Sequence, residues 1–124
     1  MYENGKIYMG LAGDKRVELA LNMCNRHGLI AGASGTGKTV TMKVMAESFS
    51  DAGVPVFLCD VKGDVAGICA PGQSSEGMEK RIDKFGLRDR FVYQGYPTTF
   101  WDVYQEGGHA VRATVSDMGP ELLS

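Results

Sequence analysis

The feature that most constrains the fold is a glycine-rich run of eight residues, Gly32-Ala33-Ser34-Gly35-Thr36-Gly37-Lys38-Thr39. It fits the pattern G-x-x-x-x-G-K-[ST] of the loop that binds phosphates in nucleoside-triphosphate-binding proteins. Glycines allow the backbone to curl around an anion with positive φ angles, so that its N–H groups converge on the phosphates. Because the N-terminus of a helix completes such an anion site, the run predicts a strand before it and a helix after it.

The flanking sequence agrees with this order. His27 to Ala31 is a short apolar run, typical of a buried parallel strand. After the loop, apolar residues recur at helical spacing as far as Ala52, and Gly53 stands where a helix commonly ends. Val54 to Cys59 is a second apolar run. Strand, helix and strand in this order predict a right-handed βαβ unit with a parallel pair of strands.

The loop also supplies the candidate site residues. We expect Lys38 to act as the catalytic charge on the β- and γ-phosphates, and the Thr39 hydroxyl to hold Mg²⁺. The sequence contains no N-K-x-D run, a motif specific for the nucleotide base, so ATP and GTP both fit these residues. The predicted nucleotide-binding residues are Gly32, Ala33, Ser34, Gly35, Thr36, Gly37, Lys38, Thr39 and Val40.

Asp60 follows the second apolar run directly. If that run is a strand, Asp60 and the following Val61-Lys62-Gly63-Asp64 lie at the ligand-binding edge of the sheet, on the side of the phosphate loop. A carboxylate in that place is a candidate catalytic acid that completes the metal shell. The alternative is a structural acid, because in many RecA-like proteins the metal-binding acid follows a later strand.

Composition narrows the function further. With 124 residues, 44% apolar and 23% charged, the chain has the make-up of an ordinary globular protein. A net charge of −2 gives no sign of a strongly basic surface for nucleic acid. Cys24, Cys59 and Cys69 form no C-x-x-C pair, which argues against a zinc site or a disulfide framework. Without a signal sequence or a membrane-length apolar run, we expect a cytoplasmic protein with no membrane partner.

Upstream of the loop, Lys6 to Leu11 and Arg16 to Leu21 show partial alternation around a turn signal, which predicts a β-hairpin. Downstream, Glu76 to Phe85 predicts a helix that Gly86 ends, while Arg90 to Tyr93 and Ala110 to Val115 are strand candidates. We therefore divide the chain into residues 1–26, the hairpin and its connection, and residues 27–124, the first part of a P-loop NTPase domain. The expected fold class is α/β, with a parallel sheet and flanking helices.

Several separated motifs resemble one family. They are Asn25-Arg26-His27-Gly28-Leu29-Ile30-Ala31 running into the loop and on to Thr41, then Ala52-Gly53-Val54-Pro55-Val56-Phe57, Asp60-Val61-Lys62-Gly63-Asp64, Phe100-Trp101-Asp102-Val103, and His109 to Pro120. Together they resemble the bacterial HerA-like (YjgR-type) branch of the HerA/FtsK group of P-loop ATPases. The resemblance implies a RecA-like ATPase domain that binds ATP and Mg²⁺, assembles as a homo-oligomeric ring and acts as a DNA-linked, helicase-like motor.

Members of that group are several times longer, and their later Walker B acid, sensor and arginine finger have no match here. The resemblance therefore implies the N-terminal portion of a larger ATPase, which alone lacks the complete catalytic site. A partial sheet leaves an unpaired edge and an exposed apolar face, so we expect the chain alone to aggregate or oligomerise.

Two other functions remain open. A small-molecule phosphotransferase also follows its phosphate loop with a strand and acidic residues, and Arg81, Arg88 and Arg90 are the candidates for its phosphate-covering lid. The third possible function is that of a nucleotide-binding or interaction module without catalysis of its own.

Overall fold

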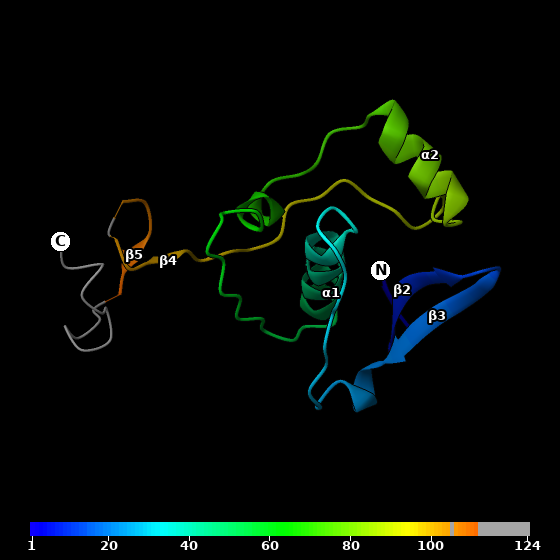
Figure 1. Ribbon diagram of the computed structural model, residues 1–124, viewed down its shortest axis with the longest axis horizontal. Coiled ribbons are helices and arrows are strands. Elements are labelled where there is room, and N and C mark those ends of the chain that lie inside the picture. Colours follow the sequence, from blue (N-terminus) through cyan, green and yellow to red (C-terminus); the bar gives the residue numbers. More distant parts are fainter. Residues whose placement is uncertain (105, 112–124) are drawn as a thin grey trace.

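The computed structural model describes residues 1–104 and 106–111. Two helices and two small sheets are arranged in an open layout, in which the last strand pair lies well apart from the helices (Figure 1). In chain order the elements are β1 (Tyr2–Glu3), β2 (Lys6–Ala12), β3 (Lys15–Ala20), the 3-10 turn η1 (Leu21–Met23), α1 (Lys38–Asp51), the 3-10 turn η2 (Ala66–Cys69), α2 (Glu76–Lys84), β4 (Trp101–Asp102) and β5 (His109–Ala110).

The predicted hairpin is confirmed. β2 and β3 pair antiparallel from Lys6 opposite Ala20 to Ala12 opposite Lys15, with a register irregularity after Tyr8. Gly13 takes a φ of 61° in the two-residue connection, a conformation that glycine adopts without steric cost. β1 adds a third antiparallel strand beside β2. Ile7 on β2 is fully buried, so the sheet has one face turned toward the rest of the molecule.

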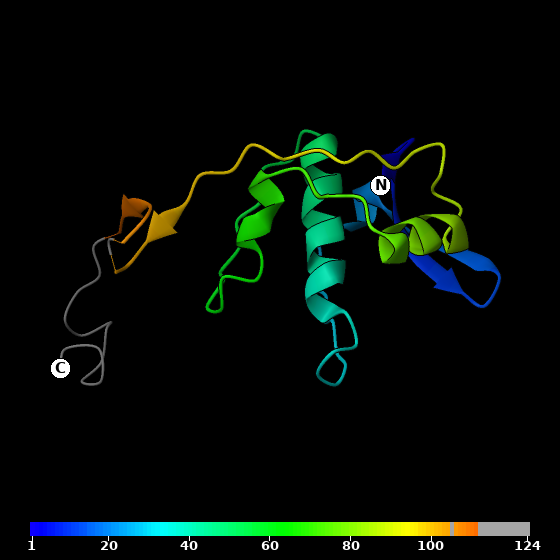
Figure 2. The ribbon, with the colours of Figure 1, turned by 90° about the horizontal axis from the view of Figure 1, so that it is seen from above.

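Helix α1 is confirmed where the apolar spacing predicts it. It begins immediately after Gly37, and its C-terminal end has Ala52 as the cap and Gly53 with a φ of 76°. The N–H of Val54 then donates to the carbonyl of Phe49 at 2.9 Å, a bond that closes the helix end. The helix contacts β1 and β2, and its buried residues are Ala46 and Ser48. It is the long central helix in Figure 2.

Helix α2 is likewise confirmed within a residue of its predicted ends. The Ser75 hydroxyl oxygen accepts a hydrogen bond from the N–H of Met78 at 3.3 Å, which caps its first turn. Gly86 follows its end with a φ of 62°. A small core lies between this helix and the hairpin, built from Tyr8, Ile82 and Leu87. The Tyr8 hydroxyl donates to the carbonyl of Phe85 at 3.2 Å and ties the two elements together.

The predicted RecA-like parallel sheet is wrong for this structure. Residues 27–31 and 54–59, as well as 90–93, form no strand, and Leu29 and Phe57 are 89% and 83% exposed. The sheets that do form are the antiparallel β1-β2-β3 and the parallel pair β4-β5. A strand forms only where a neighbouring strand pairs with its backbone, and within residues 1–104 and 106–111 no strand pairs with these apolar runs. The apolar composition of residues 27–31 and 54–59 predicted burial, and that prediction is wrong here, because composition does not supply a partner strand.

Near the end of the described chain, β4 and β5 pair in parallel through two residues each. Only Ala110 of the predicted strand at residues 110–115 lies in a strand, and residues 112–115 are outside the described part. The Asp102 carboxylate accepts hydrogen bonds from the N–H groups of Tyr104, Glu106 and Gly107, and so closes the connection between the two strands. Among the described residues, no helix is long and apolar enough to cross a membrane.

Candidate functional site

The glycine-rich loop makes a tight turn before α1. Gly35 and Gly37 have φ angles of 78° and 96°, in the region that side chains disfavour. The N–H of Thr36 points back to the carbonyl of Ala33 at 3.4 Å, as in a four-residue turn. Gly37 is a glycine that the sequence pattern requires, whereas Gly35 stands at a variable position of the pattern and takes the same kind of backbone conformation.

Lys38 folds back over this turn. Its Nζ donates a hydrogen bond to the carbonyl oxygen of Ala33 at 2.6 Å, and the Thr36 hydroxyl donates to the same oxygen at 2.7 Å. The ammonium group of Lys38, the first residue of α1, therefore lies against the backbone of the loop that precedes the helix. Because the lysine side chain is flexible, its ammonium group can leave the carbonyl and donate its hydrogen bonds to a phosphate oxygen instead.

Gly32 lines the inner side of the same turn. A Cβ at this position would lie 2.6 Å from the Thr36 hydroxyl oxygen and 3.7 Å from Cγ of Lys38. The space beside Gly32 is therefore used by side chains that the loop itself contributes. A larger residue here would displace the Thr36 hydroxyl from its place on the Ala33 carbonyl.

The N-terminus of α1 is open to an anion. Gly37 is its cap residue and offers no side-chain acceptor, and the first turn carries no acidic residue. The first intrahelical bond runs from the N–H of Thr41 to the carbonyl of Gly37 at 2.9 Å, so the N–H groups of Lys38, Thr39 and Val40 precede the helical hydrogen-bond pattern. The partial positive charge of a helix N-terminus adds to that of Lys38.

Asp60 is engaged with its own loop. Its Oδ2 accepts a hydrogen bond from the N–H of Val65 at 2.7 Å, and its Oδ1 accepts one from the N–H of Lys62 at 3.2 Å. The hydrogen bond from Val65 is the main reason why the pKa of Asp60 lies below its ordinary value, and the bond from Lys62 adds to it. Both oxygens thus serve the turn at residues 60–65, which fits the structural alternative for this acid.

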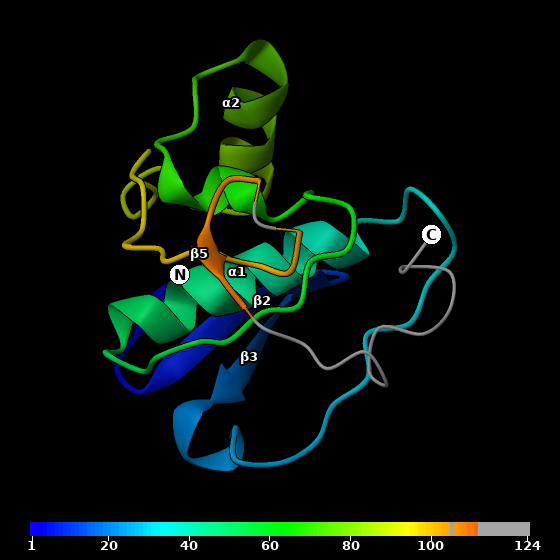
Figure 3. The ribbon, with the colours of Figure 1, turned by 90° about the vertical axis from the view of Figure 1, so that its left-hand side faces the viewer.

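The turn at residues 60–65 lies toward the glycine-rich loop, although the predicted parallel sheet between them does not form. After α1, the segment from residue 54 onward (green in Figure 3) runs back beside the helix. The turn at residues 60–65 lies toward the N-terminal end of α1, which follows the glycine-rich loop (cyan). It therefore lies toward the end of α1 that carries residues 32–40. The views in Figures 1 and 2 agree with this placement.

Two of the three candidate lid arginines, Arg88 and Arg90, are already paired, and the third, Arg81, lies on α2. Arg88 donates to Asp83 from Nε at 2.9 Å and from Nη2 at 2.6 Å, and it also pairs with Glu79. Arg90 pairs with Glu3 on β1. These ion pairs tie α2 and the segment after it to their neighbours, which is a structural use of both guanidinium groups.

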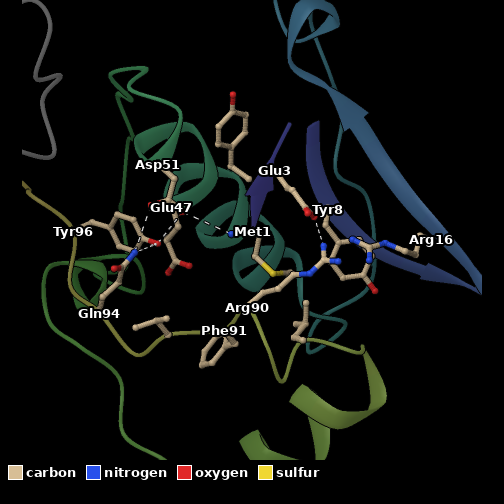
Figure 4. A pocket seen from close by; sticks show the side chains of 13 residues that line it. Met1, Glu3, Tyr8, Arg16, Glu47, Asp51, Arg90, Phe91, Gln94 and Tyr96 are labelled. Atoms are coloured by element: carbon tan, nitrogen blue, oxygen red, sulfur yellow. Dashed lines mark hydrogen bonds and ion pairs between the residues drawn. The ribbon is translucent and has the colours of Figure 1, made fainter. Parts of the chain in front are cut away.

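A cavity of about 140 Å³ lies between the hairpin, the C-terminal half of α1 and residues 87–96 (Figure 4), and no residue of the glycine-rich loop lines it. Asp51 accepts hydrogen bonds here from Gln94 at 3.4 Å and from the Tyr96 hydroxyl at 3.3 Å. Burial raises the pKa of Glu47 and that of Tyr96 above their ordinary values. No spaced motif in the sequence joins these residues, because Asp51 lies 43 and 45 residues before Gln94 and Tyr96.

Comparison with known protein families shows which family this chain belongs to. A family model described as helicase HerA-like C-terminal matches residues 8–124. That description names a C-terminal region, whereas we expected the N-terminal portion of a longer ATPase, so the match supports the family and not that position. Searches of curated proteins and of solved structures find no match.

Proposed function

Because this chain belongs to the helicase HerA-like family, we propose that it binds ATP with Mg²⁺ through residues 32–40. The observation that carries the proposal is the end of α1, where Lys38 Nζ lies 2.6 Å from the Ala33 carbonyl and the uncapped helix N-terminus lies beside it. Two positive contributions converge on one small loop, and no carboxylate in the first helical turn opposes them.

The residues present fit a nucleotide with its metal ion. Lys38 would exchange the Ala33 carbonyl for the β- and γ-phosphates, while the N–H groups from Gly35 to Val40 would hold the remaining phosphate oxygens. The Thr39 hydroxyl, in the first turn of α1, would be the protein ligand of Mg²⁺. The metal ion would neutralise phosphate charge when bound.

Membership of the family supports an ATP-driven motor that works on DNA and assembles as a ring of identical subunits. For the chain of 124 residues, one observation favours binding without turnover. Asp60 uses both of its carboxylate oxygens on backbone N–H groups of its own turn, so it is poorly placed to orient a metal-bound water. We therefore propose that ATPase turnover requires acidic and arginine groups beyond those that this chain brings to the loop.

The test measures the affinity of a fluorescent ATP analogue in the presence of Mg²⁺, for the wild-type chain and Lys38→Ala. We expect the variant to lose at least tenfold in affinity, about 1.4 kcal/mol, since one charge-assisted phosphate contact is removed. Lys80→Ala is the matched control, because it removes the same charge from the exposed side of α2, where Lys80 pairs with Glu76. Equal affinities for all three proteins would overturn the proposal.

Release of γ-phosphate, followed in the same samples with and without DNA, separates the remaining functions. Binding without release is expected for this chain. Release that DNA stimulates would place the complete motor site within it, and transfer of the phosphate to a metabolite would identify a phosphotransferase instead.

A further inference from the structure

The cavity between the hairpin, α1 and residues 87–96 has room for a small ligand. Its volume is about 140 Å³, and an apolar protein cavity of about 150 Å³ is large enough to bind benzene. Leu87 and Phe91 give this cavity apolar walls, whereas Glu47 and Asp51 of α1 bring carboxylates to it. Apolar walls with a few polar groups are the usual make-up of a small-molecule site.

Each cationic group that lines the cavity already has a carboxylate partner among the described residues. The pairs are Arg90 with Glu3, Arg16 with Glu18, and the Met1 ammonium with Asp51. The guanidinium of Arg16 also lies 4.5 Å from the centre of the Tyr8 ring. The cavity therefore accommodates one organic cation on an aromatic wall, and it holds no cation in reserve.

Glu47 is the carboxylate that these pairs leave over. Within the described part of the chain, neither a hydrogen bond nor an ion pair reaches its side chain, whereas Asp51, one turn further along α1, has the Met1 ammonium 3.7 Å from its Oδ2. Burial raises the pKa of Glu47 and Asp51 adds to the rise, while the Met1 ammonium and Lys43, which form no ion pair with it, oppose the rise. A half-buried carboxylate without a partner is unfavourable, so a cation beside Glu47 would be stabilised.

The direction of the Glu47 side chain suits such a cation. Figure 4 shows its carboxylate turned toward the space that Met1, Gln94 and Phe91 surround. An anion placed there would be repelled by Glu47, and an uncharged ligand would leave the carboxylate without a partner. A ligand that carries a positive charge at one end and a hydrocarbon body at the other fits both parts of the cavity.

We propose that this cavity binds a small organic cation, a primary alkylammonium whose ammonium group pairs with Glu47 and whose hydrocarbon chain lies against Leu87 and Phe91. The site is separate from the glycine-rich loop, since no residue of that loop lines the cavity. The proposal therefore does not depend on ATP binding at residues 32–40, and Lys38→Ala should bind the alkylammonium as the wild type does.

The test is an NMR titration of the ¹⁵N-labelled wild-type chain with n-butylammonium chloride at neutral pH. Amide resonances of residues 87–96 should shift and reach saturation. The uncharged isostere 1-butanol and the anion butyrate should each need at least about tenfold higher concentrations for the same shift, because neither can form the charge-assisted pair with Glu47. Ammonium chloride should also need at least about tenfold more, because it lacks the hydrocarbon chain.

A pair of variants locates the charge that matters. Glu47→Gln should weaken n-butylammonium binding at least about tenfold. Glu76→Gln is the matched control and should bind like the wild type, because Glu76 lies on α2, pairs with Lys80 and does not line the cavity. Circular dichroism verifies that both variants fold, and the ligand series on the wild type needs no variant.

Three results would each overturn the proposal. One is the absence of saturable shifts with n-butylammonium, which would mean that the cavity holds only water. The others are equal binding of n-butylammonium and 1-butanol, and a folded Glu47→Gln that binds n-butylammonium as tightly as the wild type.

Discussion

The hairpin β2–β3 and the apolar runs on either side of α1 are predicted as strands from the same kind of evidence, yet only the hairpin pairs. In the hairpin, two residues separate the strands, and Ile7 on β2 is completely buried. In the run at 54–59, Phe57 is as hydrophobic and remains largely exposed. The difference lies in where the partner strand comes from: a hairpin brings its own, whereas a parallel strand depends on chain that is distant in sequence.

The largest expected effect comes from the packed region. Ile7→Ala should lower the free energy of unfolding by about 2–5 kcal/mol, because it removes a buried side chain and leaves a cavity between the hairpin and α1. Urea denaturation at a single low protein concentration measures this. Phe57→Ala is the matched comparison and should change the same free energy by less than about 0.5 kcal/mol. A comparable loss in both variants would mean that the apolar run at 54–59 is packed in solution.

A change in the hairpin connection tests whether local pairing is what makes the difference. Gly13→Val should cost about 1–2 kcal/mol in the same experiment, since Gly13 has a φ of 61° and side chains disfavour that region. Gly13→Asn should lose less, because asparagine tolerates this conformation. If valine and asparagine are equally well accepted, the connection is not what holds the two strands in register.

The cap of α2 should contribute less. Ser75→Ala removes the acceptor for the N–H of Met78 and should destabilise the chain by about 1 kcal/mol. Ser75→Asp keeps an acceptor and should retain the stability of the wild type. Thermal melting followed by circular dichroism compares the three proteins, and an alanine variant that melts with the wild type would mean that the helix relies on packing of Ile82 alone.

The smallest effect is local to the turn at residues 60–65. Because the pKa of Asp60 is lowered in the folded chain, its hydrogen bonds stabilise the turn above the ordinary aspartate pKa, and this contribution is lost as the pH falls through the lowered value. The amide resonance of Val65 should therefore titrate in NMR spectra with a midpoint below that of an ordinary aspartate. In Asp60→Asn the same amide should not titrate. A midpoint at or above the ordinary value would contradict the hydrogen bond to Oδ2.

Local elements were predictable because their signals are contained in a few neighbouring residues. Gly37 and Gly53 bracket α1, Ser75 and Gly86 bracket α2, and the turn signal at 12–15 lies between strands that both show alternation. The glycine-rich loop at residues 32–37 has positive φ angles at Gly35 and Gly37, as its glycines led us to expect. The role of Asp60 was not predictable in the same way, since its position after an apolar run fits a metal-binding acid and a turn-closing acid equally well.

By itself, the sequence determined the local framework of this protein: the curl of residues 32–37, the helix that follows, and the position of Lys38 at its first residue. The physical reason is that backbone freedom at glycine, helix capping and short-range hydrogen bonds act over a few residues. Only the tertiary structure decided that residues 27–31 and 54–59 remain unpaired, that Asp60 serves its own turn, and that Asp51 meets Tyr96. Those outcomes depend on which distant segments come together, and apolar patterning specifies a need for burial without specifying the partner.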